Sequence, residues 1–263
     1  MGKDAQSLCF GGTKDKNILP LAPMTYELLY EDPQLLIVLK PAGLLTIPDR
    51  INPDKENLVG LLQRHYDKVM TVHRLDRETS GILCFARTEA AHRHLSMQFE
   101  KHTVDKYYYA LLDGVLHLDE GEINKPIGEH PVVNGKMAIS NGGKPSLTLF
   151  RAVERFKRYT LAEAMIKTGR THQIRVHFQS IGYPLAVDAL YGRRDTFLLS
   201  EIKGKKYKTG KFTEEERPLM SRTTLHAWRL RLDHPETGER MEFTAELPKD
   251  FLALVNQMRK WGA

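Results

Sequence analysis

Short apolar runs separated by polar turns recur along the chain, and their length is typical of β-strands. Residues 35–39 and 82–86 are unbroken apolar runs, as expected for strands buried in a sheet. Residues 106–112 are rich in tyrosine, and residues 159–166 alternate between apolar and polar positions. Together these segments predict a sheet at the core of the molecule.

Helices are predicted where apolar residues recur every three or four positions. The first covers residues 89–101, with Thr88 as its N-cap. The second covers residues 171–181, with Thr171 as its N-cap and Gly182 at its end. The last lies near the C-terminus, and its buried face is formed by Phe251, Leu254, Val255 and Met258.

The order of these elements indicates the fold class. Residues 226–232 and 241–245 alternate in polarity on either side of a turn, which predicts a hairpin. Strands therefore come in runs with interspersed helices, rather than as regular βαβ units. We predict an α+β fold, with a mixed, largely antiparallel sheet flanked by helices.

Composition sets the domain organisation. The chain has 263 residues, of which 41% are hydrophobic, enough for one large domain or two small ones. Residues 1–24 are polar and rich in Gly, Lys and Pro, so we expect a flexible leader before one folded domain, residues 25–263. Cys9 and Cys84 form neither a disulfide framework nor a metal site. We see no signal peptide or membrane-spanning run and expect a cytoplasmic protein.

The charge of the chain permits a nucleic-acid partner. Lys and Arg number 39 against 33 Asp and Glu, a net charge of +6. Residues 193–222 carry much of this excess and read as a basic insertion, in which Lys205 and Lys206 are candidate contacts to an RNA backbone. A flexible, solvated loop with no contact to RNA explains the same composition.

Asp76 is the first candidate for chemistry. It lies between Arg74 and Arg77 in a polar loop that passes through Gly81 into a buried strand. The flanking cations favour an ionised carboxylate, and an anchored strand would hold it in place, as an active-site nucleophile or base requires. The alternative is a surface loop whose charges are merely solvated.

A second candidate segment contains Arg170, His172 and Arg175, ahead of and within the predicted helix at residues 171–181. Helical spacing puts Arg175 beside the buried stripe, where an arginine seldom lies without a partner. The third candidate is Tyr108, which points to the opposite face of its strand from Tyr107 and Tyr109. The ordinary alternatives are a helix-surface arginine and a core tyrosine.

Histidine spacing argues against a metal site. His92 and His94 are two residues apart on a predicted helix, so their side chains diverge. His172 and His177 are five apart, which is not the i, i+4 spacing of a helical zinc pair. We therefore expect no bound metal.

These motifs resemble, in order, those of RNA pseudouridine synthases of the large-ribosomal-subunit type, the RluA family. The resemblance rests on Lys-Pro-Ala-Gly at residues 40–43, His-Arg-Leu-Asp-Arg-Glu-Thr-Ser-Gly at residues 73–81, the Lys-x-Tyr-x-Ala spacing at residues 106–110, and the Gly-Arg-Thr-His-Gln-Ile-Arg stretch at residues 169–175. It implies the pseudouridine synthase fold, with a central RNA-binding cleft.

The resemblance also implies the role of each candidate residue. Asp76 is the catalytic residue, Arg175 pairs with it, Tyr108 stacks on the target base, and Arg74 enters the RNA stack where the target nucleotide has swung out. We expect a bidentate contact between Arg175 and Asp76. We also expect RNA contacts from Arg77, Arg170 and His172.

The implied reaction detaches uracil from its ribose, turns it, and rejoins it through carbon-5, without cofactor, metal or energy source. The expected substrate is structured RNA, ribosomal or transfer, and the expected protein is a monomer. A non-catalytic RNA-binding protein on the same scaffold is one alternative. A hydrolase is another, which the lack of a second carboxylate in the motifs disfavours.

Overall fold

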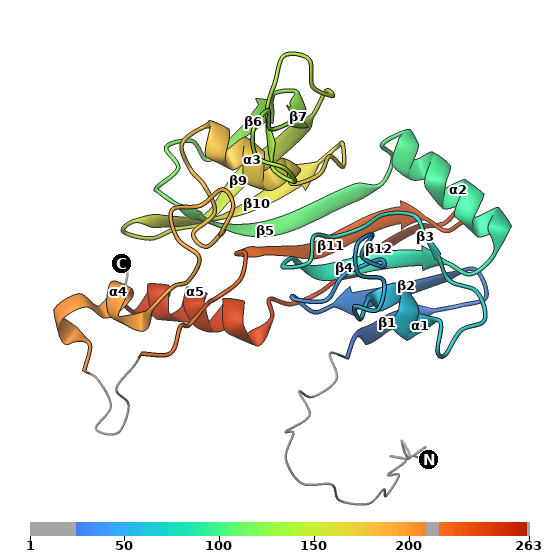
Figure 1. Ribbon diagram of the computed structural model, residues 1–263, viewed down its shortest axis with the longest axis horizontal. Helices are drawn as coiled ribbons and strands as arrows, with labels where there is room; N and C mark the ends of the chain where they lie inside the picture. Colours follow the sequence, from blue (N-terminus) through green and yellow to red (C-terminus); the bar gives the residue numbers. More distant parts are fainter. Residues whose placement is uncertain (1–24, 209–215, 262–263) are drawn as a thin grey trace, which may run out of the picture.

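A ten-stranded sheet runs through the molecule (Figure 1). The computed structural model describes residues 25–208 and 216–261, so the predicted leader lies outside the described residues. The strands of this sheet are β1 (Glu27–Glu31), β2 (Leu35–Lys40), β3 (Met70–Thr71), β4 (Ser80–Ala86), β5 (Asp105–Asp113), β6 (Glu120–Asn124), β9 (Leu147–Arg155), β10 (Tyr159–Ile166), β11 (Leu225–Asp233) and β12 (Arg240–Thr244). A separate hairpin consists of β7 (Ile127–Glu129) and β8 (Met137–Ile139).

The strand order is β1-β2-β4-β11-β5-β10-β9-β6, with β3 paired to β4 and β12 to β11. Neighbouring strands are antiparallel except β4 and β11, which pair in parallel. The prediction of a mixed, largely antiparallel sheet is therefore confirmed. The segments predicted as strands and as a hairpin all lie in this sheet.

Helices cover both faces of the sheet. They are α1 (Leu58–Leu62), α2 (Glu89–Glu100), α3 (Gln173–Ser180), α4 (Leu199–Lys203) and α5 (Lys249–Trp261). Alternation along β5 separates the faces, because Ala110 packs in one cluster with Phe178 of α3, whereas Leu111 packs with Leu254 of α5. On the face of the sheet that α5 covers, Ile37 of β2 packs with Leu95 of α2. The four apolar residues predicted for the last helix are buried.

Thr88 caps α2 as predicted, since its side chain accepts a hydrogen bond from the Ala91 N–H. The start predicted for the next helix is wrong. α3 begins at Gln173, and its N-cap is His172, whose backbone is left-handed at φ 55° and whose side chain caps nothing. Instead the Gln173 carboxamide closes the preceding turn, where its Oε1 accepts the Arg170 N–H at 3.0 Å. The His172 ring is thus free for other contacts.

Gly81 brings the Asp76 loop against the centre of the sheet. Its φ is +130°, and a Cβ at this position would lie 2.3 Å from the carbonyl oxygen of Ala227. Ala227 is its partner in the parallel pairing of β4 and β11. Only a residue without a side chain allows β4 and β11 to come this close. The Asp76 loop leads into β4 and is therefore held beside this parallel pair of strands.

Part of the predicted basic insertion has regular structure. Residues 199–203 form α4, and a 3-10 turn, Gly204–Lys206, follows it. Residues 209–215 lie outside the described residues. Within the ranges that the structure covers, no helix is both long enough and apolar enough to cross a membrane.

Candidate active site

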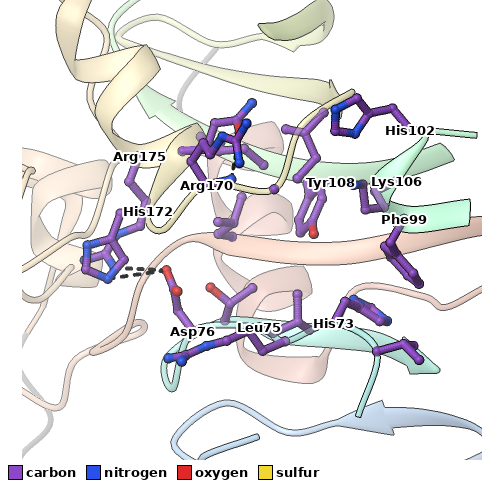
Figure 2. A pocket seen from close by; sticks show the side chains of 18 of the residues that line it. His73, Leu75, Asp76, Phe99, His102, Lys106, Tyr108, Arg170, His172 and Arg175 are labelled. Carbon is purple, nitrogen blue, oxygen red and sulfur yellow. Dashed lines mark hydrogen bonds and ion pairs between the residues drawn. The ribbon is translucent and has the colours of Figure 1, made fainter. Parts of the chain in front are cut away.

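A cavity of about 510 Å³ opens where the Asp76 loop, β5, the end of α2 and the turn before α3 meet. Such a volume lies within the usual range for small-molecule and cofactor sites. Figure 2 shows Asp76 directed toward His172 and Arg175 on one side of the cavity, with Tyr108 and Lys106 on the other. The cavity therefore brings together candidate residues from three separate motifs.

Hydrogen bonds hold the Asp76 loop on both sides of the carboxylate. Before it, the Thr46 hydroxyl donates to the Leu75 carbonyl at 2.9 Å and accepts the Leu75 N–H at 3.2 Å. After it, the Arg77 carbonyl accepts the Gly43 N–H at 2.8 Å and the Lys40 ammonium at 3.1 Å. The loop is fixed to the Lys-Pro-Ala-Gly turn, so the position of Asp76 is set by buried contacts.

Arg175 connects two carboxylates. Its Nη1 donates to Asp76 Oδ2 at 3.1 Å, which gives the contact that the sequence predicted. The bidentate contact, however, goes to Asp188, with Nε donating to Oδ2 at 2.7 Å and Nη2 to Oδ1 at 2.8 Å. The expectation of a bidentate Arg175–Asp76 pair is therefore wrong, because Asp188 already occupies the Nε–Nη2 edge.

Asp188 was absent from the sequence-based site. Its side chain is fully buried, and Oδ1 also accepts the N–H groups of Leu190 and Tyr191, at 2.9 and 3.1 Å. Asp188 thus accepts four hydrogen bonds, two of them from the Arg175 guanidinium. Burial alone would lower the pKa of Arg175, but Asp188 and Asp76 raise it above its usual value, so the guanidinium stays charged. An acid directly after the apolar residues 185–187 is the signal that could have found it.

His172 faces the same oxygen of Asp76. Its Nε2 lies 3.8 Å from Asp76 Oδ2, and its Nδ1 lies 2.8 Å from the Tyr191 hydroxyl oxygen. Burial is the main cause of a lowered pKa for His172; the charge of Asp76 opposes this shift, and the charge of Arg175 adds to it. The imidazole is therefore neutral at physiological pH.

Tyr108 and Lys106 are two residues apart on β5, so both side chains point to the cavity side of the strand. Each is 7% exposed. Burial raises the pKa of Tyr108, and the charge of Asp76 adds to the rise, so the phenol stays protonated. Burial, with nearby Lys167, lowers the pKa of Lys106 to about 8. The Lys106 ammonium lies 5.5 Å from the centre of the Phe99 ring and forms no ion pair with any carboxylate of residues 25–208 or 216–261.

The remaining predicted RNA contacts fall into two groups. Arg74 and Arg170 line the cavity, and Arg74 is exposed. Arg77 is exposed outside it, with Nε donating to the Gly43 carbonyl at 3.0 Å. Lys205 and Lys206 also lie away from the cavity, next to α5, where Lys206 Nζ is 5.6 Å from the centre of the Trp261 ring. RNA contact by all of these residues stays a prediction.

One further carboxylate lies on the cavity wall. Glu100, the last residue of α2, is exposed and makes no hydrogen bond or ion pair with Asp76, Arg175 or Asp188. In the described part of the chain, no three His, Cys, Asp or Glu side chains are arranged to hold a metal ion.

Comparison with known proteins places this chain in a family. Residues 34–180 match the RNA pseudouridylate synthase family. Ribosomal large subunit pseudouridine synthase D of Pseudomonas aeruginosa is 40% identical over 239 residues, which are 89% of this chain and 72% of that protein. An uncharacterised RNA pseudouridine synthase of Bacillus subtilis, YlyB, is 36% identical over 91% of this chain and 75% of that protein.

Solved structures agree on the fold. Human RNA pseudouridylate synthase domain containing 4 superposes with a TM-score of 0.69 at 21% identity, over 89% of this chain and 93% of that one. The human domain containing 1 gives a TM-score of 0.64 at 25% identity, over 92% and 98%. The fold is thus that of a pseudouridine synthase domain. The chain belongs to the RluA-type RNA pseudouridine synthases, isomerases that convert uridine in RNA to pseudouridine.

Proposed function

We propose that this chain modifies uridine in large-subunit ribosomal RNA and that Asp76 is the carboxylate that acts on the target nucleotide. The choice of RNA is supported by the relative from Pseudomonas aeruginosa, whose name specifies the large ribosomal subunit and which matches most of this chain. The choice of Asp76 is supported by one observation above all. Its carboxylate faces the cavity while a buried, charged arginine binds one of its two oxygens.

The reaction needs no outside reagent. The bond between N1 of uracil and C1′ of ribose breaks, a bond between C5 and C1′ forms, C5 loses a proton, and N1 gains one. No water is added, so the second carboxylate that glycoside hydrolysis uses has no counterpart in this reaction. Because Arg175 binds Oδ2 of Asp76, Oδ1 is the oxygen directed to the nucleotide.

Neighbouring side chains would hold the nucleotide in the cavity. Tyr108 offers a protonated phenol ring at the cavity wall, against which the target base can stack, a contact worth roughly 1–3 kcal/mol. Arg74 is exposed beside it and is suited to fill the gap that an extruded base leaves in the RNA. Arg170 and His172 complete the wall on the α3 side.

Release of tritium from RNA labelled at carbon-5 of uridine tests this function. The substrates are transcripts of large-subunit ribosomal RNA, small-subunit ribosomal RNA and transfer RNA, each incubated with the parent enzyme. We expect release from the large-subunit transcript. Release from transfer RNA alone would overturn the assignment of the substrate.

Two variants test the role of Asp76 in the same assay. Asp76→Asn keeps the shape of the side chain but cannot act as nucleophile or base, so we expect no turnover and nearly unchanged RNA affinity. Asp54→Asn removes an exposed carboxylate and is the matched control, expected to equal the parent. Substantial turnover by Asp76→Asn would remove Asp76 from the mechanism. Pseudouridine mapping in a deletion strain then identifies the uridine.

A further inference from the structure

Tyr191 is a buried residue that no sequence motif singled out, and it contacts two residues of the active site and the backbone of β8. Its side chain is 3% exposed. Its hydroxyl oxygen accepts the Met137 N–H at 2.7 Å and lies 2.8 Å from His172 Nδ1. Its ring lies under the Arg175 guanidinium, 4.9 Å from the ring centre. Tyr191 therefore touches both residues that face Asp76 Oδ2.

Counting donors assigns the proton between Tyr191 and His172. A phenol hydroxyl has one proton to donate, whereas its oxygen can accept more than one hydrogen bond. The Met137 N–H already donates to this oxygen, so the hydroxyl proton is left to donate. Within the described part of the chain, the acceptor at hydrogen-bond distance from this hydroxyl is His172 Nδ1. The alternative, Nδ1–H donating to the oxygen, would leave a buried hydroxyl proton without an acceptor.

A neutral imidazole that accepts at Nδ1 carries its proton on Nε2. Burial keeps the pKa of His172 below its usual value, so the ring is neutral at physiological pH. The Nε2–H then faces Asp76 Oδ2 across 3.8 Å. This distance exceeds that of a hydrogen bond, and such contacts commonly shorten when substrate binds.

We infer that Tyr191 is a positioning residue that holds His172 in the Nε2–H tautomer and thereby directs a neutral hydrogen-bond donor at Oδ2 of Asp76. Arg175 is hydrogen-bonded to the same oxygen at 3.1 Å, so Oδ2 faces two donor groups and Oδ1 is left for the nucleotide. This inference rests on the proposed function in one respect, namely that Asp76 is the reacting carboxylate.

The backbone of His172 supports the assignment. Its φ of 55° is in the left-handed region, which is strained for a non-glycine residue and persists where surrounding contacts enforce it. This conformation, one residue before α3, directs the ring to Tyr191 and Asp76 together. Tyr191 is itself held in place, because its N–H donates to Asp188 Oδ1.

Two substitutions of His172 test which ring nitrogen matters. In His172→Gln the side-chain amide nitrogen takes the place of Nε2, whereas in His172→Asn it takes the place of Nδ1. We expect the glutamine variant to retain most of the single-turnover rate of tritium release. The asparagine variant should be slower, by up to about 100-fold, because Asp76 loses a donor that orients it. An asparagine variant as fast as the glutamine variant would overturn the inference.

Tyr191→Phe separates positioning from packing. The phenyl ring keeps the contact with Arg175 but has no proton for His172, and it also leaves the Met137 N–H without its acceptor. In the parent background we expect a clear drop in the single-turnover rate. In the His172→Gln background the same substitution should have no further effect on rate, since there is no tautomer to select. Equal rate losses in both backgrounds would show a purely structural role.

Nitrogen-15 NMR of protein with labelled histidines determines which ring nitrogen of His172 carries the proton. The measurement does not depend on catalytic activity. The parent should show His172 protonated on Nε2, and Tyr191→Phe should show a mixture of tautomers. A parent ring protonated on Nδ1 would overturn the inference. This readout also keeps the two proposals distinguishable: active Asp76→Asn would end the proposed role of Asp76 while leaving the measured tautomer as it stands.

Discussion

Arg175 is bound by Asp188 through two hydrogen bonds, at 2.7 and 2.8 Å, and offers a single donor to Asp76. Asp188 is fully buried, whereas the Asp76 side chain is 25% exposed. Asp188 therefore holds the guanidinium from the protein interior. Nη1 is the nitrogen that is left to bind Asp76. Any change at Asp188 should reach the candidate catalytic carboxylate through Arg175, although no hydrogen bond joins the two acids directly in the described structure.

Replacing Asp188 by asparagine should lower both stability and activity. The buried guanidinium would lose its anionic partner, and breaking a buried pair on one side typically costs about 3–5 kcal/mol. Urea unfolding measures the stability, and tritium release measures the activity. Glu154→Gln is the matched control, because its pair with Arg259 is partly exposed and worth at most about 1 kcal/mol. If Asp188→Asn unfolds and turns over like the parent, Arg175 does not depend on Asp188.

Tyr108→Phe should keep base stacking and lose only the contribution of the hydroxyl. Tyr108→Ala should lose both and slow the single-turnover reaction further, because a stacked base contributes roughly 1–3 kcal/mol. Tyr107→Ala provides the control, since Tyr107 points to the opposite face of β5, with Arg229 3.9 Å from its ring centre. An alanine variant no slower than the phenylalanine variant would show that Tyr108 does not stack on the base.

The affinity for RNA should fall as pH rises above about 8. Burial lowers the pKa of Lys106 to about 8, and this ammonium faces the cavity without an ion-pair partner among the described residues. RNA phosphate favours the charged form and so raises the pKa in the complex. Affinity is then highest below the pKa of the free enzyme and declines above it, by at most about tenfold per pH unit.

Binding titrations between pH 7 and pH 9 at constant ionic strength measure this effect, with Asp76→Asn used to prevent turnover. Lys106→Met in the same background should bind RNA more weakly at pH 7 and show a flatter pH dependence. Should the pH dependence persist in full without Lys106, a different group is responsible for it.

The lysines beside α5 should affect binding rather than chemistry. Replacing Lys205 and Lys206 by alanine should reduce the slope of log affinity against log salt by roughly 0.7–0.9 for each phosphate contact that is lost. Lys55 and Lys68 are suitable controls, because each already pairs with a carboxylate. Unchanged slopes in the Lys205 and Lys206 variants would mean that this part of the basic insertion contacts only solvent.

Local patterns predicted most of the secondary structure, because apolar periodicity and caps depend on neighbouring residues. The Thr88 cap and the buried face of α5 are confirmed for this reason. The start of α3 was missed because the Gln173 side chain, and not Thr171, bonds to the preceding turn. Helices α1 and α4 were missed, and so were strands β1, β3, β6, β7, β8 and β9. The residues of β6, β8 and β9 are half-exposed and charged in places, so their pairing depends on partners distant in sequence.

In the candidate site, too, contacts that depend on residues distant in sequence could not be predicted. The motifs indicated that Arg175 would meet Asp76, and the structure has this contact at 3.1 Å. They could not indicate that Asp188 takes the bidentate edge, because this depends on how the segment after α3 folds back on the helix. Tyr191 escaped notice for the same reason, since its partners Met137 and His172 come from elements that only the folded chain brings together.

The anchoring of the Asp76 loop has a consequence for which uridines can react. Lys40 donates from a fully buried ammonium to the carbonyls of Pro41, Leu44 and Arg77, so the turn and the loop move as one body. If Asp76 acts on the nucleotide as proposed, the RNA must distort to bring its nucleotide to this fixed carboxylate. The free energy of unstacking then becomes part of substrate choice. Uridines in loops and other easily opened segments should react before equally accessible uridines in stable helices. The reason is the lower free energy of unstacking them, whatever the surrounding sequence.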